Sequence, residues 1–151
     1  MSKIVFVVGH SNWGKSKTLK SLTNGSHYIK NYRINNIDWF IRRMSNDDYP
    51  DGYYDFINDL DIKTKPNVIA AFCPNFDEVR NEKTVEILNS LKIKGYDLYF
   101  WVIEHQFNTK NKMDSFFIDK LKNFGKVEIY SKCEEADLRA SSLKDFIKKY
   151  T

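Results

Sequence analysis

Residues 4–16 read IVFVVGHSNWGKS, an apolar run of five residues followed at once by an eight-residue stretch that starts at Gly9 and includes Gly14. Five consecutive apolar residues predict a short strand that is buried on both faces, as in a parallel sheet. Residues 17–22 continue with a helical pattern. The stretch therefore predicts a strand, a tight loop and a helix in direct succession, and this succession decides the fold class.

Further apolar runs repeat the strand pattern along the chain, and helical patterns separate them. Strands are expected at residues 68–72 and 99–103, and a shorter, alternating one at 127–130 is a candidate for an edge strand; residues 27–29 are a weaker candidate. Helices are expected where apolar side chains recur at helical spacing, at 85–91, 113–124 and 138–150. Strands that alternate with helices predict an α/β fold of three layers, α/β/α, with a mostly parallel sheet of about five strands.

The segment 34–65 is a long excursion between two expected core strands. Four of its apolar side chains have helical spacing: Ile37, Phe40, Ile41 and Met44. A turn-rich stretch follows at 46–52, and long excursions in compact domains tend to be functional. The sequence predicts one domain over residues 1–151, with a helical cap or acceptor-binding insertion at about 34–65.

Length and composition also indicate one globular domain, with 151 residues of which 42% are hydrophobic and 29% charged. The net charge of +4 suits polyanionic ligands, although solubility explains it equally well. Cys73 and Cys133 stand far apart without a histidine at metal-ligand spacing, which argues against a zinc site and for reduced thiols. No apolar run is long enough for a signal-peptide core or a bilayer span, so a cytoplasmic protein with no membrane partner is expected.

The eight residues after the first strand fit G-x-x-x-x-G-K-[ST], a pattern that binds nucleotide phosphates when a strand precedes it and a helix follows. Glycine lets the backbone bend tightly around a phosphate, and Asn12 tolerates left-handed geometry. Backbone N–H groups from about Trp13 to Lys17 would form an anion nest at the positive end of the helix. The predicted binding residues for ATP or another nucleoside triphosphate are Gly9, His10, Ser11, Asn12, Trp13, Gly14, Lys15, Ser16 and Lys17.

Two of these residues have specific expected roles. Lys15 should reach the β- and γ-phosphates, and the Ser16 hydroxyl should be a ligand of Mg²⁺. Trp13 is bulky for a loop residue, and packing against the core is the favoured interpretation. A histidine beside such a loop, such as His10, is more often an ordinary polar residue than a catalytic one.

On this loop and its flanking strand and helix, the chain resembles the P-loop NTPase superfamily over most of its length. Its layout is most similar to small P-loop kinases, including polynucleotide kinases and their nucleoside- and metabolite-kinase relatives. ATPases of the motor and AAA kind end a neighbouring core strand in Asp, whereas Cys73 and Pro74 follow the strand here. This difference favours kinase-like chemistry over a water-activating ATPase. Asp77 could serve magnesium, but the N-cap of the next helix is its favoured role.

The resemblance also implies an acceptor site. Many such kinases place an Asp just after the second strand, where it accepts the acceptor's proton or holds Mg²⁺ through water, and an Arg one turn later that binds the acceptor. Here Asp38 would be the base, and Arg42 or Arg43 the acceptor clamp. Asp38 and Arg42 would be i,i+4 neighbours on one helix face, a spacing that a plain surface ion pair also explains.

The leading functional hypothesis is phosphoryl transfer from ATP to a hydroxyl of a small molecule or a polynucleotide end, with Lys15, Asp38 and Arg42 as catalytic residues. The resemblance also implies an arginine-bearing lid, but no arginine lies between Glu104 and Arg139. Arg80 or Arg139 could substitute for it. A nucleotide-dependent binding module with little or no phosphotransfer is the alternative, and a structural remnant that no longer binds nucleotide is the third hypothesis.

Overall fold

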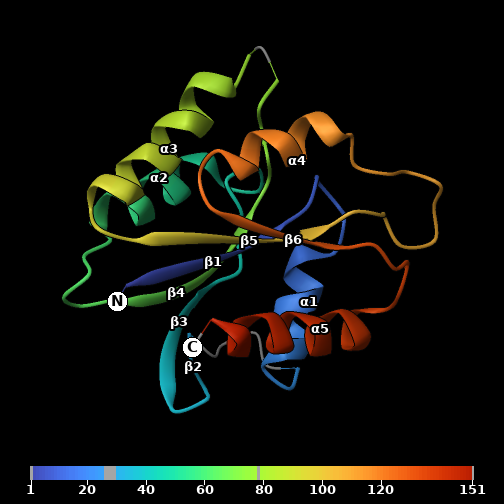
Figure 1. Cartoon of the computed structure of the whole chain (residues 1–151), viewed down its shortest axis with the longest axis horizontal. Coiled ribbons are helices and arrows are strands. Elements are labelled where there is room, and N and C mark those ends of the chain that lie inside the picture. Colours follow the sequence, from blue (N-terminus) through green and yellow to red (C-terminus); the bar gives the residue numbers. More distant parts are fainter. Residues whose placement is uncertain (1, 26–29, 78, 151) are drawn as a thin grey trace.

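The computed structural model describes residues 2–25, 30–77 and 79–150, which form an α/β fold of six strands and five helices (Figure 1). The strands are β1 (Lys3–Val8), β2 (Asn31–Ile34), β3 (Ile37–Arg42), β4 (Asn67–Phe72), β5 (Asp97–Ile103) and β6 (Lys126–Tyr130). The helices are α1 (Lys15–Leu22), α2 (Pro50–Asp59), α3 (Asn81–Ile93), α4 (Ser115–Lys122) and α5 (Ala136–Lys149). The weak strand candidate at 27–29 lies outside the described residues.

All six strands form one sheet in the order β2-β3-β4-β1-β5-β6. Five of them run parallel, and β2 alone is antiparallel to its neighbour β3. The prediction of a mostly parallel sheet is confirmed. The expected number of about five strands is one too low, because β2 and β3 form a hairpin that the sequence analysis did not find.

The centre of the sheet is β1, which pairs with β4 on one side and β5 on the other. Residues 4–8 are fully buried, as the run of five apolar residues predicts for a strand covered on both faces. Aromatic rings fill part of this core: the Phe6 ring lies 5.0 Å from that of Phe72 and 5.3 Å from that of Phe100. The high aromatic content of the chain is therefore at least partly a property of its core.

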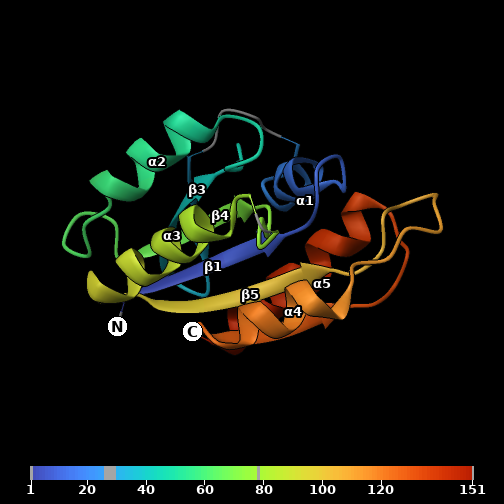
Figure 2. The same cartoon turned by 90° about the horizontal axis from the view of Figure 1, so that it is seen from above.

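Helices lie on both sides of the sheet (Figures 1 and 2). Helices α2, α3 and α4 lie on one side, and α1 and α5 pack together on the other. Within the described residues no helix is long and apolar enough to cross a membrane.

The segment 34–65 has a different structure from the one predicted. Ile37, Phe40 and Ile41 belong to strand β3, and the expected helix there is wrong. Trp39 and Ile41 are buried on one face of the strand, whereas Met44 is 49% exposed. A helix does follow in the same segment, as α2 at Pro50–Asp59.

Parallel strands bring their carboxyl ends to one edge of the sheet. The connections that leave this edge are residues 9–14 after β1, 43–49 after β3, 73–80 after β4, 104–114 after β5 and 131–135 after β6. Ligands of open α/β sheets bind at this edge. It is therefore the place to look for a functional site.

Candidate functional site

The loop 9–14 joins the buried strand β1 to helix α1. Asn12 and Gly14 both have left-handed backbone conformations, with φ of 64° and 86°. The left-handed geometry that the sequence analysis allowed for at Asn12 is present, and the φ of Gly14 favours glycine. A Cβ at Gly14 would also lie 2.6 Å from a guanidinium nitrogen of Arg139, which would have to shift.

The amino end of α1 faces out from this loop. The helix begins at Lys15, so the N–H groups of its first turn have no acceptor inside the helix and are available to an anion. The Trp13 N–H, which was expected to point at an anion, instead donates to His10 O at 3.2 Å. Ser16 and Lys17 are exposed in this first turn, where a ligand can reach them.

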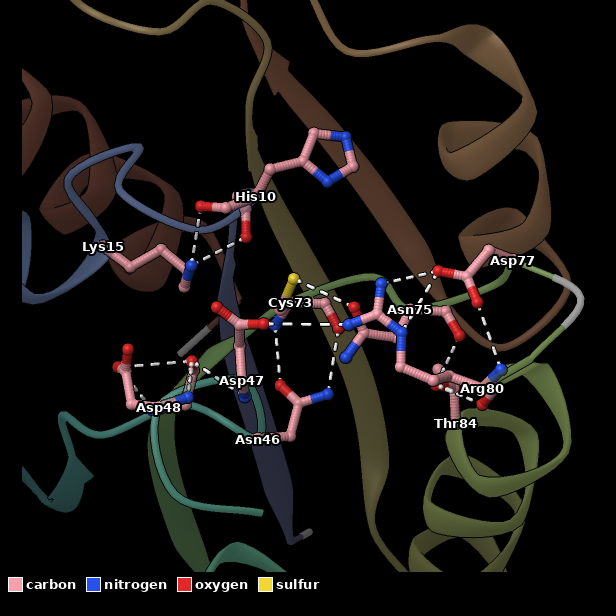
Figure 3. Close-up of polar contacts among 12 residues, drawn as sticks. His10, Lys15, Asn46, Asp47, Asp48, Cys73, Asn75, Asp77, Arg80 and Thr84 are labelled. Carbon is pink, nitrogen blue, oxygen red and sulfur yellow. Dashed lines mark hydrogen bonds and ion pairs between the residues drawn. The ribbon is translucent and has the colours of Figure 1, made fainter.

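Lys15 is buried, with 6% of its surface exposed. Its Nζ donates to Gly9 O at 2.8 Å and to His10 O at 2.9 Å, so the ammonium group is held by neutral carbonyls and forms no ion pair within the described residues (Figure 3). Burial lowers the pKa of Lys15 because it disfavours the charged form. An anion at this position would stabilise the charged lysine.

A cavity of about 440 Å³ lies in front of the loop, within the size range of small-ligand sites. Residues 12–17 form one wall. Asp48, Phe107, Glu135, Ala136 and Arg139 complete the lining. Trp13 is 7% exposed and packs edge-on against the His10 ring at 4.9 Å, so its expected role in packing is confirmed, although it also borders the cavity.

The structure does not bring Asp38 to this site. Asp38 lies near the amino end of β3, opposite Arg33 in the hairpin, and its side chain is 73% exposed in an ion pair of 3.5 Å with Arg33. Arg42 is four positions further along the strand, about 13 Å away at the usual rise. The two residues are therefore not helical neighbours, and the alternative interpretation of Asp38 as half of a surface ion pair is correct, with Arg33 as its partner.

The two arginines of the predicted acceptor clamp are also held elsewhere. The Arg42 guanidinium lies over the Phe56 ring of α2, 5.3 Å from its centroid. Arg43 donates to Thr23 Oγ1 at 2.7 Å, just beyond the end of α1. Neither side chain lines the cavity at the loop.

Two carboxylates other than Asp38 lie next to the loop 9–14. Asp47 and Asp48 lie in the connection after β3, close enough to influence the charge of Lys15, and Asp48 lines the cavity (Figure 3). The preceding residue fixes this connection: Asn46, buried, donates to Cys73 O at 3.0 Å and accepts from Cys73 N–H at 2.8 Å. We call residues 45–48 the acidic segment.

The sequence analysis missed the acidic segment because it read β3 as a helix. A signal was present: the two residues between β2 and β3, Asn35 and Asn36, both have positive φ, and a two-residue Asn turn between apolar runs is typical of a hairpin. Had β3 been recognised as a strand, the acids that follow it would have been placed at the carboxyl edge of the sheet.

The turn after β4 is neutral where it meets the loop. Burial raises the pKa of the Cys73 thiol to about 11, so Cys73 is protonated near neutral pH. Asp77 binds Arg80 at 2.6 Å, and Arg80 also lies 3.8 Å from Asp47. The prediction of Asp77 as an N-cap is wrong, since Arg80 occupies the N-cap position of α3 and Asp77 accepts from its N–H in the preceding turn.

The connection after β5 also contacts the loop 9–14. Gln106 donates to Asn12 O at 3.3 Å, and Phe107, 38% exposed, lines the cavity. His105 and Lys112 form an isolated bridge that closes this connection on itself. Within the described residues no group of three or more His, Cys, Asp or Glu side chains is assembled as a metal site, so Mg²⁺ at Ser16 would need phosphate oxygens and water as further ligands.

Comparison with family models, curated proteins and solved structures finds no match for this chain. Its function has to be argued from the site.

Proposed function

We propose that the chain binds a nucleoside triphosphate with Mg²⁺ at the loop 9–14 and transfers the terminal phosphoryl group to a hydroxyl. In this proposal the sheet and its two helical sides are a three-layer α/β/α nucleotide-binding fold, and the loop after β1 is the phosphate loop of the P-loop NTPase superfamily. The geometry of Lys15 carries the proposal. It is a buried ammonium group without an ion pair, beside the free N–H groups of a helix terminus and a ligand-sized cavity.

The residues present fit a magnesium nucleotide. The first-turn N–H groups of α1 and the Lys15 ammonium supply positive charge for the phosphates, and the exposed Ser16 hydroxyl is available as a metal ligand. Magnesium, when bound, would neutralise charge on the transferring group. The apolar surface of Phe107, which lines the same cavity, suits a nucleoside base.

For the chemical step, we propose Asp48 in the role that the sequence analysis gave to Asp38. The acceptor oxygen forms a bond to the terminal phosphorus, the bond from that phosphorus to the bridging oxygen breaks, and the nucleoside diphosphate leaves with the electron pair. The acceptor's proton passes to the Asp48 carboxylate. Asp48 is exposed and lines the cavity, whereas Asp47 is largely buried beside Arg80.

A transfer assay with labelled ATP tests this proposal against a panel of nucleosides, nucleotides, sugars and 5′-hydroxyl oligonucleotides. We expect Asp48→Asn to abolish transfer to the active acceptor while ATP affinity changes less than about threefold. Asp38→Asn is the matched control and should transfer at the wild-type rate. Normal transfer by Asp48→Asn would show that Asp48 is not the general base. Failure of the wild type to bind ATP would contradict the proposed function as a whole.

A nucleotide-dependent binding module is the second candidate function. Its support is the set of exposed apolar side chains around the acidic segment: Met44 is 49% exposed, Tyr49 53% and Val79 92%. A partner could cover them when nucleotide orders the segment. Tight ATP binding with no transfer to any acceptor in the panel would favour this function over the kinase.

A further inference from the structure

Arg139 lies in the first turn of α5, and its guanidinium reaches across to the loop at the start of α1. It is 4% exposed. Its Nε donates to Thr18 Oγ1 at 2.9 Å, its Nη1 to Glu134 O at 2.7 Å and its Nη2, more weakly, to Gly14 O at 3.5 Å. All three acceptors are neutral, and the side chain also forms part of the cavity wall.

No carboxylate neutralises this guanidinium. Glu134 offers it only a backbone carbonyl, because the Glu134 carboxylate accepts from the Tyr130 hydroxyl. Glu135 is exposed on the same cavity and forms no ion pair with Arg139, nor does any other acid among the described residues. A buried charge without a counter-ion is costly, so its presence needs a reason beyond packing.

The position of buried charge in the molecule supplies that reason. Across the residues that the structure describes, Lys15 and Arg139 are the only buried charged side chains, and both contact the loop 9–14. They approach it from different directions, Lys15 at the carbonyls of Gly9 and His10, and Arg139 at Gly14 and Thr18. Two buried cations that form no ion pair within the described residues, both in contact with one loop, match a ligand with more than one phosphate.

Arg80, the other arginine that could replace a lid arginine, is in a different situation. It is half exposed, it binds the Asp77 carboxylate through both Nε and Nη2, and it lies near Asp47. Its charge is therefore already neutralised by acids of the protein. Of the two arginines, only Arg139 is without an anion.

Building on the proposed function, we propose that Arg139 is a second phosphate-binding residue, which holds the phosphate nearest the nucleoside while Lys15 holds the terminal phosphates. Arg139 contacts Gly14 and Thr18, whereas Lys15 is held at Gly9 and His10, so the two cations meet different parts of the site. The same cavity is lined by Phe107 and Ala136, whose apolar surface suits the nucleoside. A planar guanidinium can give two parallel hydrogen bonds to one phosphate. Helix α5 thereby contributes to the site an arginine, which the connection after β5 lacks.

The proposal is tested by calorimetric titration of ATP, ADP, AMP and tripolyphosphate into the wild type, Arg139→Met and Lys15→Met. We expect Arg139→Met to weaken ATP and ADP by the same factor, about 10- to 100-fold, since both carry the phosphate that Arg139 holds. AMP binding should also fall. Lys15→Met should weaken ATP and ADP but leave AMP unchanged, and Arg139→Lys should recover part of the loss.

A purely structural role for Arg139 predicts a different result. If Arg139 only braced the loop, Arg139→Met would lower the melting temperature of the ligand-free protein. We expect that temperature to stay within about 2 °C of the wild type or to rise, because the variant removes an unneutralised buried charge. Arg33→Met, at an exposed arginine in the hairpin, is the matched control and should leave both affinity and melting temperature unchanged.

The outcomes separate this proposal from the function on which it rests. Wild-type ATP affinity in Arg139→Met, or a large loss of ligand-free stability in that variant, would overturn the role of Arg139 and leave the proposed function intact. If tripolyphosphate binds in a manner that depends on Arg139 but no nucleotide binds, the site is an anion site and the proposal of a nucleotide ligand is overturned. A wild type that binds none of the four ligands overturns both.

Discussion

His10 sits between two aromatic rings, edge-on to Trp13 at 4.9 Å and to Phe117 at 4.8 Å. Burial lowers the pKa of His10 from its usual 6.5, the positive charges of Lys15 and Arg80 lower it further, and Asp47 partly opposes them. The folded protein therefore holds this imidazole in its neutral form. The loop that we propose as an anion site thus gains no positive charge from His10 near neutral pH.

This environment predicts a pH-dependent stability. Above pH 6.5 His10 is neutral in both the folded and the unfolded chain; as the pH falls through 6.5, the unfolded chain takes up a proton that the folded chain resists. The free energy of unfolding should therefore decrease between pH 7 and pH 5.5, and less steeply in His10→Phe, which keeps the aromatic packing. Urea unfolding at four pH values measures this. Parallel profiles for the two proteins would contradict the prediction, since the other histidines are common to both.

At the level of elements, helix α2 ends without a basic residue in its last turn, and a lysine from another helix compensates. Lys94, at the C-cap of α3, donates from Nζ to the carbonyls of Ile57, Asn58 and Leu60 at 2.6–2.8 Å. Carbonyls at a helix carboxyl end lack partners within the helix, and a cation there also suits the helix dipole. One side chain thus fastens α2 to α3.

Lys94→Met should lower the free energy of unfolding by about 1.5–3 kcal/mol, the range for hydrogen bonds to a charged group. Lys92→Met, an exposed lysine two residues earlier on α3, is the control and should stay within about 0.5 kcal/mol of the wild type. Chemical denaturation of the three proteins measures both effects. Equal stability of the two variants would show that Lys94 contributes no more than a surface lysine.

Elements that the core determines were predictable from the sequence. The strands β1, β4 and β5 follow from apolar runs, because a strand covered on both faces needs apolar side chains at nearly every position. Strand β6 lies at the edge of the sheet, and its alternating sequence predicted it. Strand β3 is half covered, so its pattern is mixed, and Ile37, Phe40 and Ile41 fit a helical spacing as well as a strand. The segment is a strand because it pairs with β2 and β4, and its partners in β4 lie far away in the sequence.

The candidate site was predictable on its loop side alone. The pattern at residues 9–16 is local in sequence, so both the left-handed positions and the exposed Ser16 could be anticipated. Asp48 and Arg139 reach the same cavity from residues 32 and 123 positions beyond Ser16, through sheet order and helix packing. No spacing rule connects residues so far apart. The error at Asp38 followed directly from the error at β3.

On the scale of the whole molecule, the cavity, the acidic segment and the two buried cations all lie at the carboxyl edge of the sheet. The sheet itself contributes apolar side chains and rigidity. A ligand that binds at this edge of the folded protein, and has no site in the unfolded chain, must stabilise the whole domain.

We therefore expect ATP with Mg²⁺, at about 100 times its dissociation constant, to add about 2.7 kcal/mol to the free energy of unfolding. For a domain of this size, this corresponds to a rise in melting temperature of about 5–10 °C. A chelator of Mg²⁺ should reduce the shift, and Lys15→Ala should abolish it at the same ATP concentration. A shift that persists in Lys15→Ala would place the ligand elsewhere on the protein.

The paired hydrogen bonds between Asn46 and Cys73 also determine how one amide proton exchanges with solvent. The Cys73 N–H is held by a side chain, Asn46 Oδ1, at 2.8 Å, rather than by the carbonyl of a neighbouring strand. In deuterated water this proton can exchange whenever the hydrogen bond to Asn46 breaks, whereas the amides inside β4 exchange only when the sheet opens. Its exchange rate therefore measures how often the acidic segment separates from Cys73. Bound nucleotide should slow exchange at residue 73 more than in the strand before it.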